Sequence, residues 1–357
     1  MNKKHNGLVG FYKFIFSLVI VFFHSTDFYK NIENPFFKHG YIGVEFFFLV
    51  SGYYFAKSTL KGSYSKEKIG INDVQMIWKK LKSLIPYIIC AYLVSICWAV
   101  YERHFGTADL INSIWNLLLI KQFGLRGAPL LAQLWFLSSM LISMFALYPF
   151  VKKYKENFIM IGSSIIVLVG LGYLNHIQEG LNISHETWLF FSRAGTARAF
   201  VEINLGMIIY VVNKHLKEIK YTNFFATMMT ILQHLLIIIV LLIVTFIDNS
   251  PKYDYILLLF ITIAIQIMVS EKTKDFKLFQ KKSIYYLEKL SLPIFINHKV
   301  FTDIIQNINY FATINPIIQT FIAIGLTIAV SVIEMEIIKI FENKNLSSRV
   351  KKLIVAE

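Results

Sequence analysis

Five titratable side chains stand inside apolar stretches of this sequence: His24, Glu45, Arg198, Glu202 and His298. An ionisable group inside a membrane span costs at least a few kcal/mol and is by default a functional candidate. Imidazoles and carboxylates are the usual groups of general acid–base catalysis, and a guanidinium can stabilise negative charge that develops in a reaction. The set therefore predicts proton or group transfer in an apolar environment.

Helical rise gives these groups a depth, measured from the nearest lysine that borders the stretch. His24 lies eleven residues beyond Lys13, which corresponds to about 16 Å along a helix. Glu45 and Glu202 each lie twelve residues from a bordering lysine, or about 18 Å. Arg198 stands one turn farther on the same helix face as Glu202. We therefore expect groups from several helices to meet at one level.

Each group also has a structural interpretation. An intramembrane histidine such as His24 or His234 often only forms a hydrogen bond to a neighbouring helix. Arg198 and Glu202, four residues apart, could be an ion pair within one helix. No short His or Cys spacing supports a zinc site, so we expect no metal. The remaining histidines fall in expected loops or tails and are predicted to be solvated: His5, His39, His104, His176, His185 and His215.

The composition indicates which kind of element must position these groups. The 357 residues are 56% hydrophobic and 16% charged, with a mean hydropathy of +0.56. Soluble domains are about 45–50% apolar and about 25% charged, so a soluble enzyme and a disordered chain are excluded. The net charge of +14 is typical of cytoplasmic loops rich in Lys and Arg, and we expect no nucleic-acid partner.

Apolar runs of about 17–25 residues fit the thickness of a lipid bilayer. The chain is therefore predicted to be an all-α, polytopic integral membrane protein whose single domain covers residues 1–357. The segment 110–120 is shorter and more polar, and we expect an interfacial or re-entrant helix there. About ten transmembrane helices are expected, near residues 9–29, 36–56, 83–101, 131–151, 158–174, 194–213, 223–247, 254–270, 284–305 and 315–338.

The distribution of basic residues predicts the orientation. With the N-terminus inside, the inner segments carry 26 of the 36 Lys and Arg residues, the outer segments carry 6, and 4 fall at or within spans. Cytoplasmic loops carry the excess of Lys and Arg, so both termini are expected in the cytoplasm.

Two motifs in the first two expected spans resemble a known family. The first is Lys13-x10-His24, and the second is the run GVEFFFLVSGY at 43–53. Together they resemble the acyltransferase-3 family, the integral membrane O-acyltransferases of bacterial surface polysaccharides. The resemblance extends from residue 8 to about 340 and predicts a short, single-domain member. Its further elements are Lys79-Lys80-Leu-Lys82 with Pro86-Tyr87, Leu134-Trp135-Phe136-Leu137, Arg198 with Glu202 and Gly206, and Ser291 with Asn297-His298.

The chain departs from the family pattern at two places. Lysines stand at 79 and 82 where arginines are usual, so bidentate phosphate contacts become point-charge contacts. Ser138-Ser139-Met140 replaces an acidic stretch that many members carry after the tryptophan motif, which removes a carboxylate from the fourth span.

The resemblance implies acyl transfer from cytosolic acyl-CoA, with acetyl as the expected group, to a hydroxyl of a cell-surface or lipid-linked glycan in a bacterial plasma membrane. Acyl-CoA would be the donor substrate, with no permanently bound cofactor. Lys13, Lys79 and Lys82 would hold the CoA phosphates, and neutral His24 would act as general base or carry the acyl group itself. Glu45 would orient the imidazole of His24 or stabilise its protonated form.

Three further residues are assigned to the transition state or to acceptor contacts: Arg198, Glu202 and His298. Arg198 would stabilise charge on the thioester carbonyl or contact the glycan. The main alternative is a transporter or flippase for a glycan or a lipid-linked intermediate, and a second is a scaffold of a polysaccharide synthase. A transporter would need no acyl-CoA and would not depend on a neutral His24.

Overall fold

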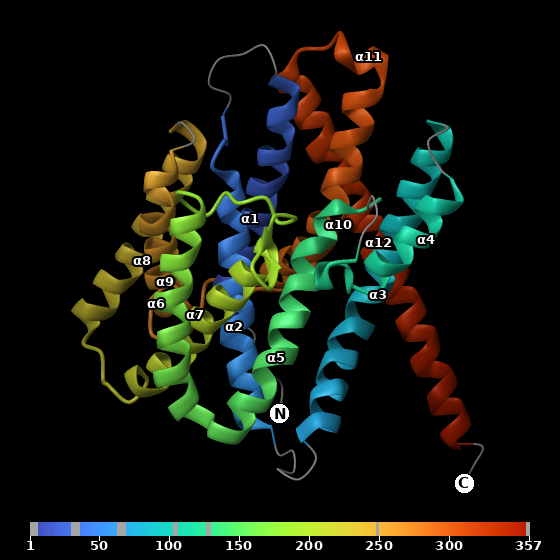
Figure 1. Ribbon diagram of the computed structural model, residues 1–357. Helices are drawn as coiled ribbons and strands as arrows, with labels where there is room; N and C mark the ends of the chain where they lie inside the picture. Colours follow the sequence, from blue (N-terminus) through green and yellow to red (C-terminus); the bar gives the residue numbers. More distant parts are fainter. Residues whose placement is uncertain are drawn as a thin grey trace.

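The computed structural model describes residues 6–29, 36–62, 69–102, 106–125, 130–247 and 250–354, and for residues 312 and 342–354 it describes the backbone only. Figure 1 shows the long helices side by side in one bundle, with α8 and α9 at one edge and α3, α4 and α12 at the other. The α-helices are α1 (Gly7–His24), α2 (Gly43–Lys61), α3 (Ile69–Tyr101), α4 (Thr107–Leu117), α5 (Trp135–Asn157), α6 (Ser164–Ile177), α7 (Ala194–Leu216), α8 (Asn223–Phe246), α9 (Asp254–Ser270), α10 (Lys282–Asn307), α11 (Asn309–Ala312) and α12 (Pro316–Ile354).

Short elements connect these helices. Within the described residues, strand is confined to a small antiparallel hairpin in which Trp188 pairs with Arg193. The connecting elements that matter below are the 3₁₀ helices η1 (Ser25–Tyr29) and η2 (Gly40–Ile42), the π-helical turn η6 (Phe158–Ser163), and the strands β1 (Trp188–Leu189) and β2 (Ser192–Arg193).

The prediction of an all-α membrane protein is confirmed, and helix occupies most of each of the ten expected ranges. Among the described residues, seven helical stretches are long and apolar enough to cross a membrane, and one of them, Ala132–Ile177, contains both α5 and α6. The two remaining predicted spans correspond to α2 and α10, which carry the polar groups of the motifs. The number of spans stays a prediction, and residues 1–5 and 355–357 at the two termini lie outside the described residues.

Two helices extend beyond the predicted apolar runs. The segment before 83 was predicted as an inner loop, but α3 is one continuous helix from Ile69, and α12 continues past 338 to Ile354. Lys, Gln, Met and Leu are good helix formers, so a helix can continue into a polar environment after its apolar run has ended. Lys79 and Lys82 therefore lie on α3 and not in a loop.

Helix α4 occupies the segment expected to be interfacial. Its polar residues Ser113 and Asn116 are buried against the protein, where the Asn116 amide donates to the Leu131 carbonyl oxygen at 3.0 Å. Leu110 and Ile111 on the opposite face are more than half exposed. This inverted amphipathic pattern suits a helix that lies against lipid, and its interfacial position stays a prediction.

Helices α2 and α7 pack with their backbones in close approach. A Cβ added to Gly52 would stand 2.2 Å from the Ile203 carbonyl oxygen, and one added to Gly206 would stand 2.2 Å from that of Leu49. Small residues permit such approach between membrane helices. The glycine of the second motif therefore serves helix packing, and the contact brings Glu45 of α2 beside Arg198 of α7.

We expect Gly52→Ala and Gly206→Ala each to destabilise the fold by about 1–3 kcal/mol, the usual range for overpacking, because the added methyl group meets backbone that cannot rotate away. Thermal denaturation of the detergent-solubilised protein, followed by size-exclusion chromatography, measures the effect. Gly172→Ala on α6 is the matched control, because nothing lies within 4 Å of its added Cβ. Equal melting temperatures for the three variants would contradict this account of the interface.

Candidate functional site

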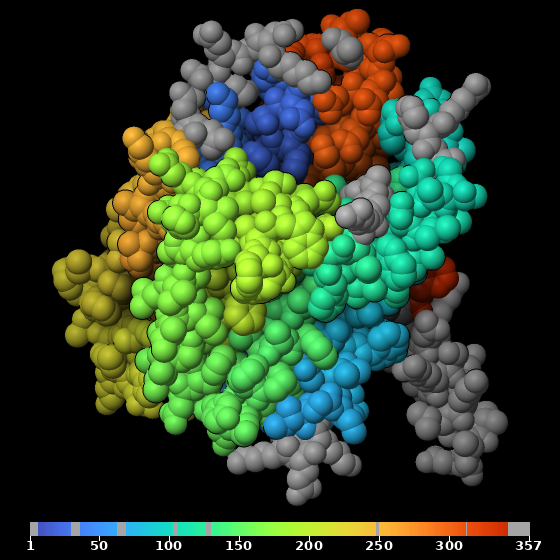
Figure 2. Space-filling view, viewed as in Figure 1, coloured from blue at the N-terminus to red at the C-terminus, as the bar shows by residue number. Residues whose placement is uncertain are grey.

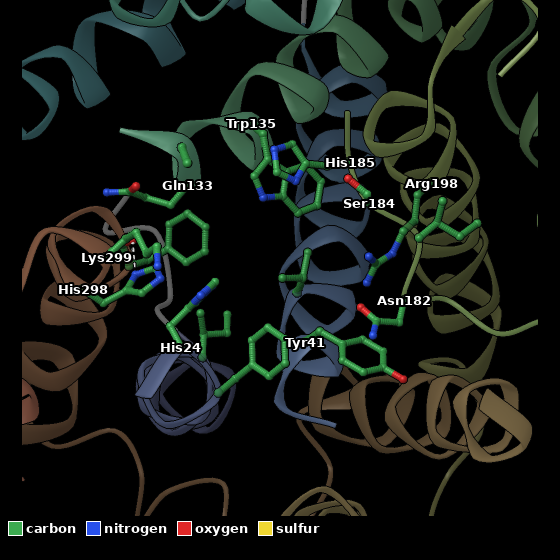
Figure 3. A pocket seen from close by; sticks show the side chains of 16 residues that line it. His24, Tyr41, Gln133, Trp135, Asn182, Ser184, His185, Arg198, His298 and Lys299 are labelled. Atoms are coloured by element: carbon green, nitrogen blue, oxygen red, sulfur yellow. Dashed lines mark hydrogen bonds between the residues drawn. The ribbon is translucent and has the colours of Figure 1, made fainter. Parts of the chain in front are cut away.

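A cavity of about 160 Å³ lies among helices α1, α5, α7 and α10. Its basic side chains come from four parts of the chain: His24 of α1, His185 of the loop before β1, Arg198 of α7, and His298 with Lys299 of α10. Figure 3 shows His24, His298 and Lys299 on one side of the cavity and Arg198 on the opposite side. The structure thus brings three of the five titratable residues named from the sequence to one cavity.

The two imidazoles on α1 and α10 lie close together. The ring centroids of His24 and His298 are 4.9 Å apart, with 34° between the ring planes. His298 is fully buried, and its Nδ1 lies 2.7 Å from the Phe295 carbonyl oxygen. Within the described part of the chain, His24 makes no hydrogen bond. Its imidazole is therefore available to a ligand in the cavity.

The guanidinium of Arg198 is shared between two buried carboxylates. Its Nη2 donates to Glu45 Oε1, and its Nε lies 3.4 Å from Glu202 Oε1. Glu45 and Glu202 are fully buried, and Arg198 is 4% exposed. The ion pair expected within one helix therefore also includes α2.

Glu45 makes a contact that the sequence did not predict. The sequence places Glu45 and His24 at similar depth, but depth does not determine which way a side chain points around its helix. In the structure Glu45 is bound to Arg198, and no hydrogen bond joins it to His24 in the described residues. In this structure Glu45 therefore contacts the guanidinium, and its expected role beside His24 stays a prediction.

The three lysines expected to hold a donor do not line the cavity. Lys13 Nζ forms an ion pair of 2.8 Å with Glu288 Oε1 of α10 and lies 5.3 Å from the centre of the Tyr54 ring. Lys79 and Lys82 are exposed on α3. Glu288 was not predicted as a partner of Lys13, although a carboxylate inside a predicted span was a usable signal.

His185 and His39 were expected to be solvated, and for both the prediction was wrong. His185 lines the cavity and stacks on Trp135, with 4.9 Å between ring centroids and 14° between ring planes. Burial, with further contributions from nearby cations that include Lys121, lowers the pKa of His185 to about 4. The ring is therefore neutral at ordinary pH.

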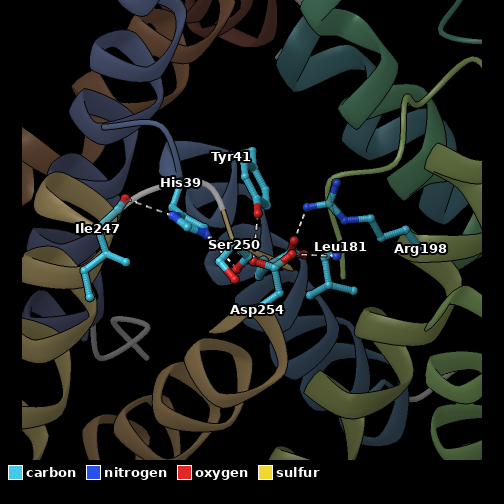
Figure 4. Close-up of polar contacts among 8 residues, drawn as sticks. His39, Tyr41, Leu181, Arg198, Ile247, Ser250 and Asp254 are labelled. Carbon is cyan, nitrogen blue, oxygen red and sulfur yellow. Dashed lines mark hydrogen bonds and ion pairs between the residues drawn. The ribbon is translucent and has the colours of Figure 1, made fainter. Parts of the chain in front are cut away.

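His39 is fully buried, and its ring nitrogens lie 3.4 and 3.1 Å from the carbonyl oxygens of Ile247 and Ser250 (Figure 4). His176 and His215 are exposed as expected, while His5 and His104 lie outside the described residues. His234 forms the predicted interhelical hydrogen bond, with 2.5 Å between its Nδ1 and the Tyr12 hydroxyl.

Asp254, at the start of α9, connects two walls of the cavity. Its Oδ1 accepts from the Tyr41 hydroxyl at 2.7 Å, and its Oδ2 accepts from the Leu181 backbone N–H at 2.6 Å (Figure 4). Gly180 has a φ of 84°, a left-handed conformation that favours glycine. Residues 182–185 follow directly and line the cavity. In the space-filling view, the yellow-green segment between α6 and α7 spreads over this face of the bundle (Figure 2).

We expect Asp254→Asn to release this segment. A hydrogen bond to a charged group contributes about 1.5–3 kcal/mol, so the Leu181 amide should exchange its hydrogen about 10- to 100-fold faster. Hydrogen–deuterium exchange mass spectrometry of the peptide over residues 178–187 measures this rate. Tyr41→Phe is the matched control, because it removes the phenol contact and keeps the carboxylate on Leu181. Unchanged exchange in Asp254→Asn would contradict the proposed tether.

A comparison of the chain with protein-family models gives one match. The family model described as acyltransferase domain, of the acyltransferase-3 type, matches residues 11–335, which include the cavity-lining residues named above. No curated protein and no solved structure gives a significant match to the chain. A match over nearly the whole bundle shows that the chain belongs to the acyltransferase-3 family and is a multi-pass membrane acyltransferase.

Proposed function

We propose that the protein transfers an acetyl group from cytosolic acetyl-CoA to a hydroxyl of a cell-surface or lipid-linked glycan, in the plasma membrane of a bacterium. The observation that carries the proposal is an unbonded imidazole, His24, facing Arg198 across a small buried cavity. The imidazole supplies a base, and the guanidinium supplies positive charge where a thioester carbonyl oxygen would become negative.

The reaction conserves atoms and charge in a simple way. The acceptor hydroxyl gives its proton to His24 as its oxygen forms a bond to the thioester carbon. The carbon–sulfur bond then breaks, and His24 returns the proton to the CoA sulfur. In the second route a nitrogen of His24 forms the bond to the thioester carbon, the carbon–sulfur bond breaks, and CoA leaves as its thiolate. The hydroxyl oxygen then bonds to the acetyl carbon as the bond to His24 breaks, and the hydroxyl proton goes to the CoA sulfur. Both routes need the same unbonded nitrogen.

The size and lining of the cavity favour a short acyl group. The space of about 160 Å³ between the walls is about that of one benzene-sized group, which suits an acetyl group. Ile20, Val44 and Phe295 supply an apolar wall for a methyl group. This combination supports acetyl as the transferred group.

The donor would enter from the inner end of the bundle. Lys79 and Lys82 are exposed on α3, and neither forms an ion pair with a described residue, so both can meet phosphate oxygens. Lys13 lies eleven residues before His24 on α1, a distance of about 16 Å that suits the pantetheine arm between the CoA phosphates and the thioester. Glu288, which now pairs with Lys13, would give way to a phosphate or share the ammonium with it.

The test uses the full chain in liposomes with [¹⁴C]acetyl-CoA and surface glycan isolated from the producing cells. We expect base-labile label on the glycan and equal release of CoA, both absent from empty liposomes. Succinyl-CoA serves as a second donor and should give less product. The proposal is overturned if no donor yields label while glycan export from cells depends on the chain, because a transporter would behave in that way.

A further inference from the structure

His298 presents an unused hydrogen-bond acceptor at the cavity. Its Nδ1 lies 2.7 Å from the Phe295 carbonyl oxygen, which can only accept, so Nδ1 carries the proton. In a neutral imidazole the lone pair is then on Nε2. His298 is fully buried, and its Nε2 has no hydrogen-bond partner among the described residues. The backbone of α10 thus fixes this ring as an acceptor.

The ring of His24 lies where it can use that acceptor. If each ring points a nitrogen directly at the other, centroids 4.9 Å apart leave about 2.6 Å between the nitrogens, and a small turn of either ring gives the separation of about 2.7–3.2 Å of an ordinary hydrogen bond. The 34° between the planes and the freedom of His24 from other described hydrogen bonds permit this alignment. Catalytic hydrogen bonds often tighten only when substrate binds.

No carboxylate takes this place in the described structure. Glu45 and Glu202 hold Arg198, and Asp254 holds Tyr41 and the Leu181 amide. Asp27 and Asp303 lie 3.8 and 2.8 Å from Lys299 Nζ. The other titratable groups that face the two rings are Lys299, His185, Arg198 and Tyr41. Each is a cation, a ring stacked elsewhere or a phenol that already donates to Asp254.

We propose that His298 is the positioning residue of His24. Its Nε2 accepts a hydrogen bond from the protonated nitrogen of His24, so the other nitrogen of His24 keeps its lone pair toward the cavity. The inference rests on the proposed role of His24 as base or acyl carrier. When His24 takes the proton of the acceptor hydroxyl, the hydrogen bond to His298 stabilises the imidazolium, and the proton leaves to the CoA sulfur as described above. A neutral ring here orients the base without placing a second buried charge beside it.

Two substitutions separate this role from a merely structural one. The end of a glutamine side chain lies near the position of a histidine Nε2, whereas an asparagine ends near that of Nδ1. His298→Gln can therefore still offer an acceptor to His24, and His298→Asn cannot. Both variants remain polar and are smaller than a ring, so neither overfills the site.

The first measurement is the protonation pattern of His24, by ¹⁵N solid-state NMR of the full chain in liposomes with ¹⁵N-labelled histidine. The His24 signals are assigned by their loss in His24→Gln. We expect one neutral tautomer in the wild type and in His298→Gln, and a mixture of tautomers in His298→Asn. A mixture in the wild type, which requires no variant to fold, would overturn the proposal.

The second measurement is transfer from [¹⁴C]acetyl-CoA. We expect His298→Asn to lower kcat by about 10²-fold, within the range that a positioned base supplies, with an unchanged KM for acetyl-CoA. The acidic limb of its kcat/KM profile should also move, and His298→Gln should recover most of the rate. An unchanged pH profile in His298→Asn would reject His298 as the positioning residue. If the wild type transfers nothing but keeps a single His24 tautomer that His298→Asn abolishes, the proposed function fails while the positioning contact stands.

Discussion

His24→Gln is expected to lower the rate of acetyl transfer by about 10²–10⁴-fold, because a positioned general base contributes that much and glutamine cannot take up a proton. The loss should be in kcat, since the CoA phosphates are expected to meet lysines at the inner end of the bundle. Stability should change little, because the glutamine side chain is polar and fits within the space of the imidazole ring. The assay counts label on glycan per mole of monodisperse protein in liposomes.

The matched control is His176→Gln, which changes an exposed histidine on α6, away from the cavity. It should leave transfer at the wild-type rate. A rate for His24→Gln within threefold of this control would remove His24 from the chemistry.

Rapid quenching with [¹⁴C]acetyl-CoA and no acceptor then separates the two routes. Label bound to wild-type chain and absent from His24→Gln indicates an acyl carrier, and no bound label in either indicates a base.

The sequence identified site residues where an ionisable side chain stands inside an apolar run. His24, Arg198 and His298 could be found because an ionisable group in an apolar run requires a reason, and all three line the cavity. Helical rise predicted a similar level for His24, Glu45 and Glu202, with Arg198 one turn farther. It could not predict direction around a helix axis, and for that reason Glu45 was assigned to His24 although it binds Arg198.

The missed residues lie where hydropathy carries little information. His185 belongs to a loop, and Asp254 begins an apolar helix at a position where an acidic residue commonly interacts with the helix N-terminus. Their burial depends on tertiary contacts with Trp135 and with Leu181, which no local pattern encodes. Gly180 could have served as a signal, because a glycine shortly before a buried segment can mark a left-handed turn.

Arg198→Met is expected to destabilise the protein by about 3–5 kcal/mol, because it leaves two buried carboxylates without a cation. The side chain of methionine occupies a similar space, so the loss comes from charge and not from a cavity. Arg198→Lys should be intermediate, since an ammonium cannot engage both carboxylates with a planar fork. Thermal denaturation of the detergent-solubilised variants measures the series.

The triple variant Glu45→Gln, Arg198→Met, Glu202→Gln separates the structural role of Arg198 from its role in transfer. Replacing a whole buried ion network with neutral groups is often close to neutral for stability, so this variant should recover most of the lost melting temperature. Its transfer rate should nevertheless stay about 10²-fold below that of the wild type, because nothing then opposes negative charge on the thioester oxygen. A stable triple variant that transfers acetyl at the wild-type rate would make the guanidinium a purely structural group. Recovered folding without recovered transfer would place Arg198 in the reaction, opposite His24.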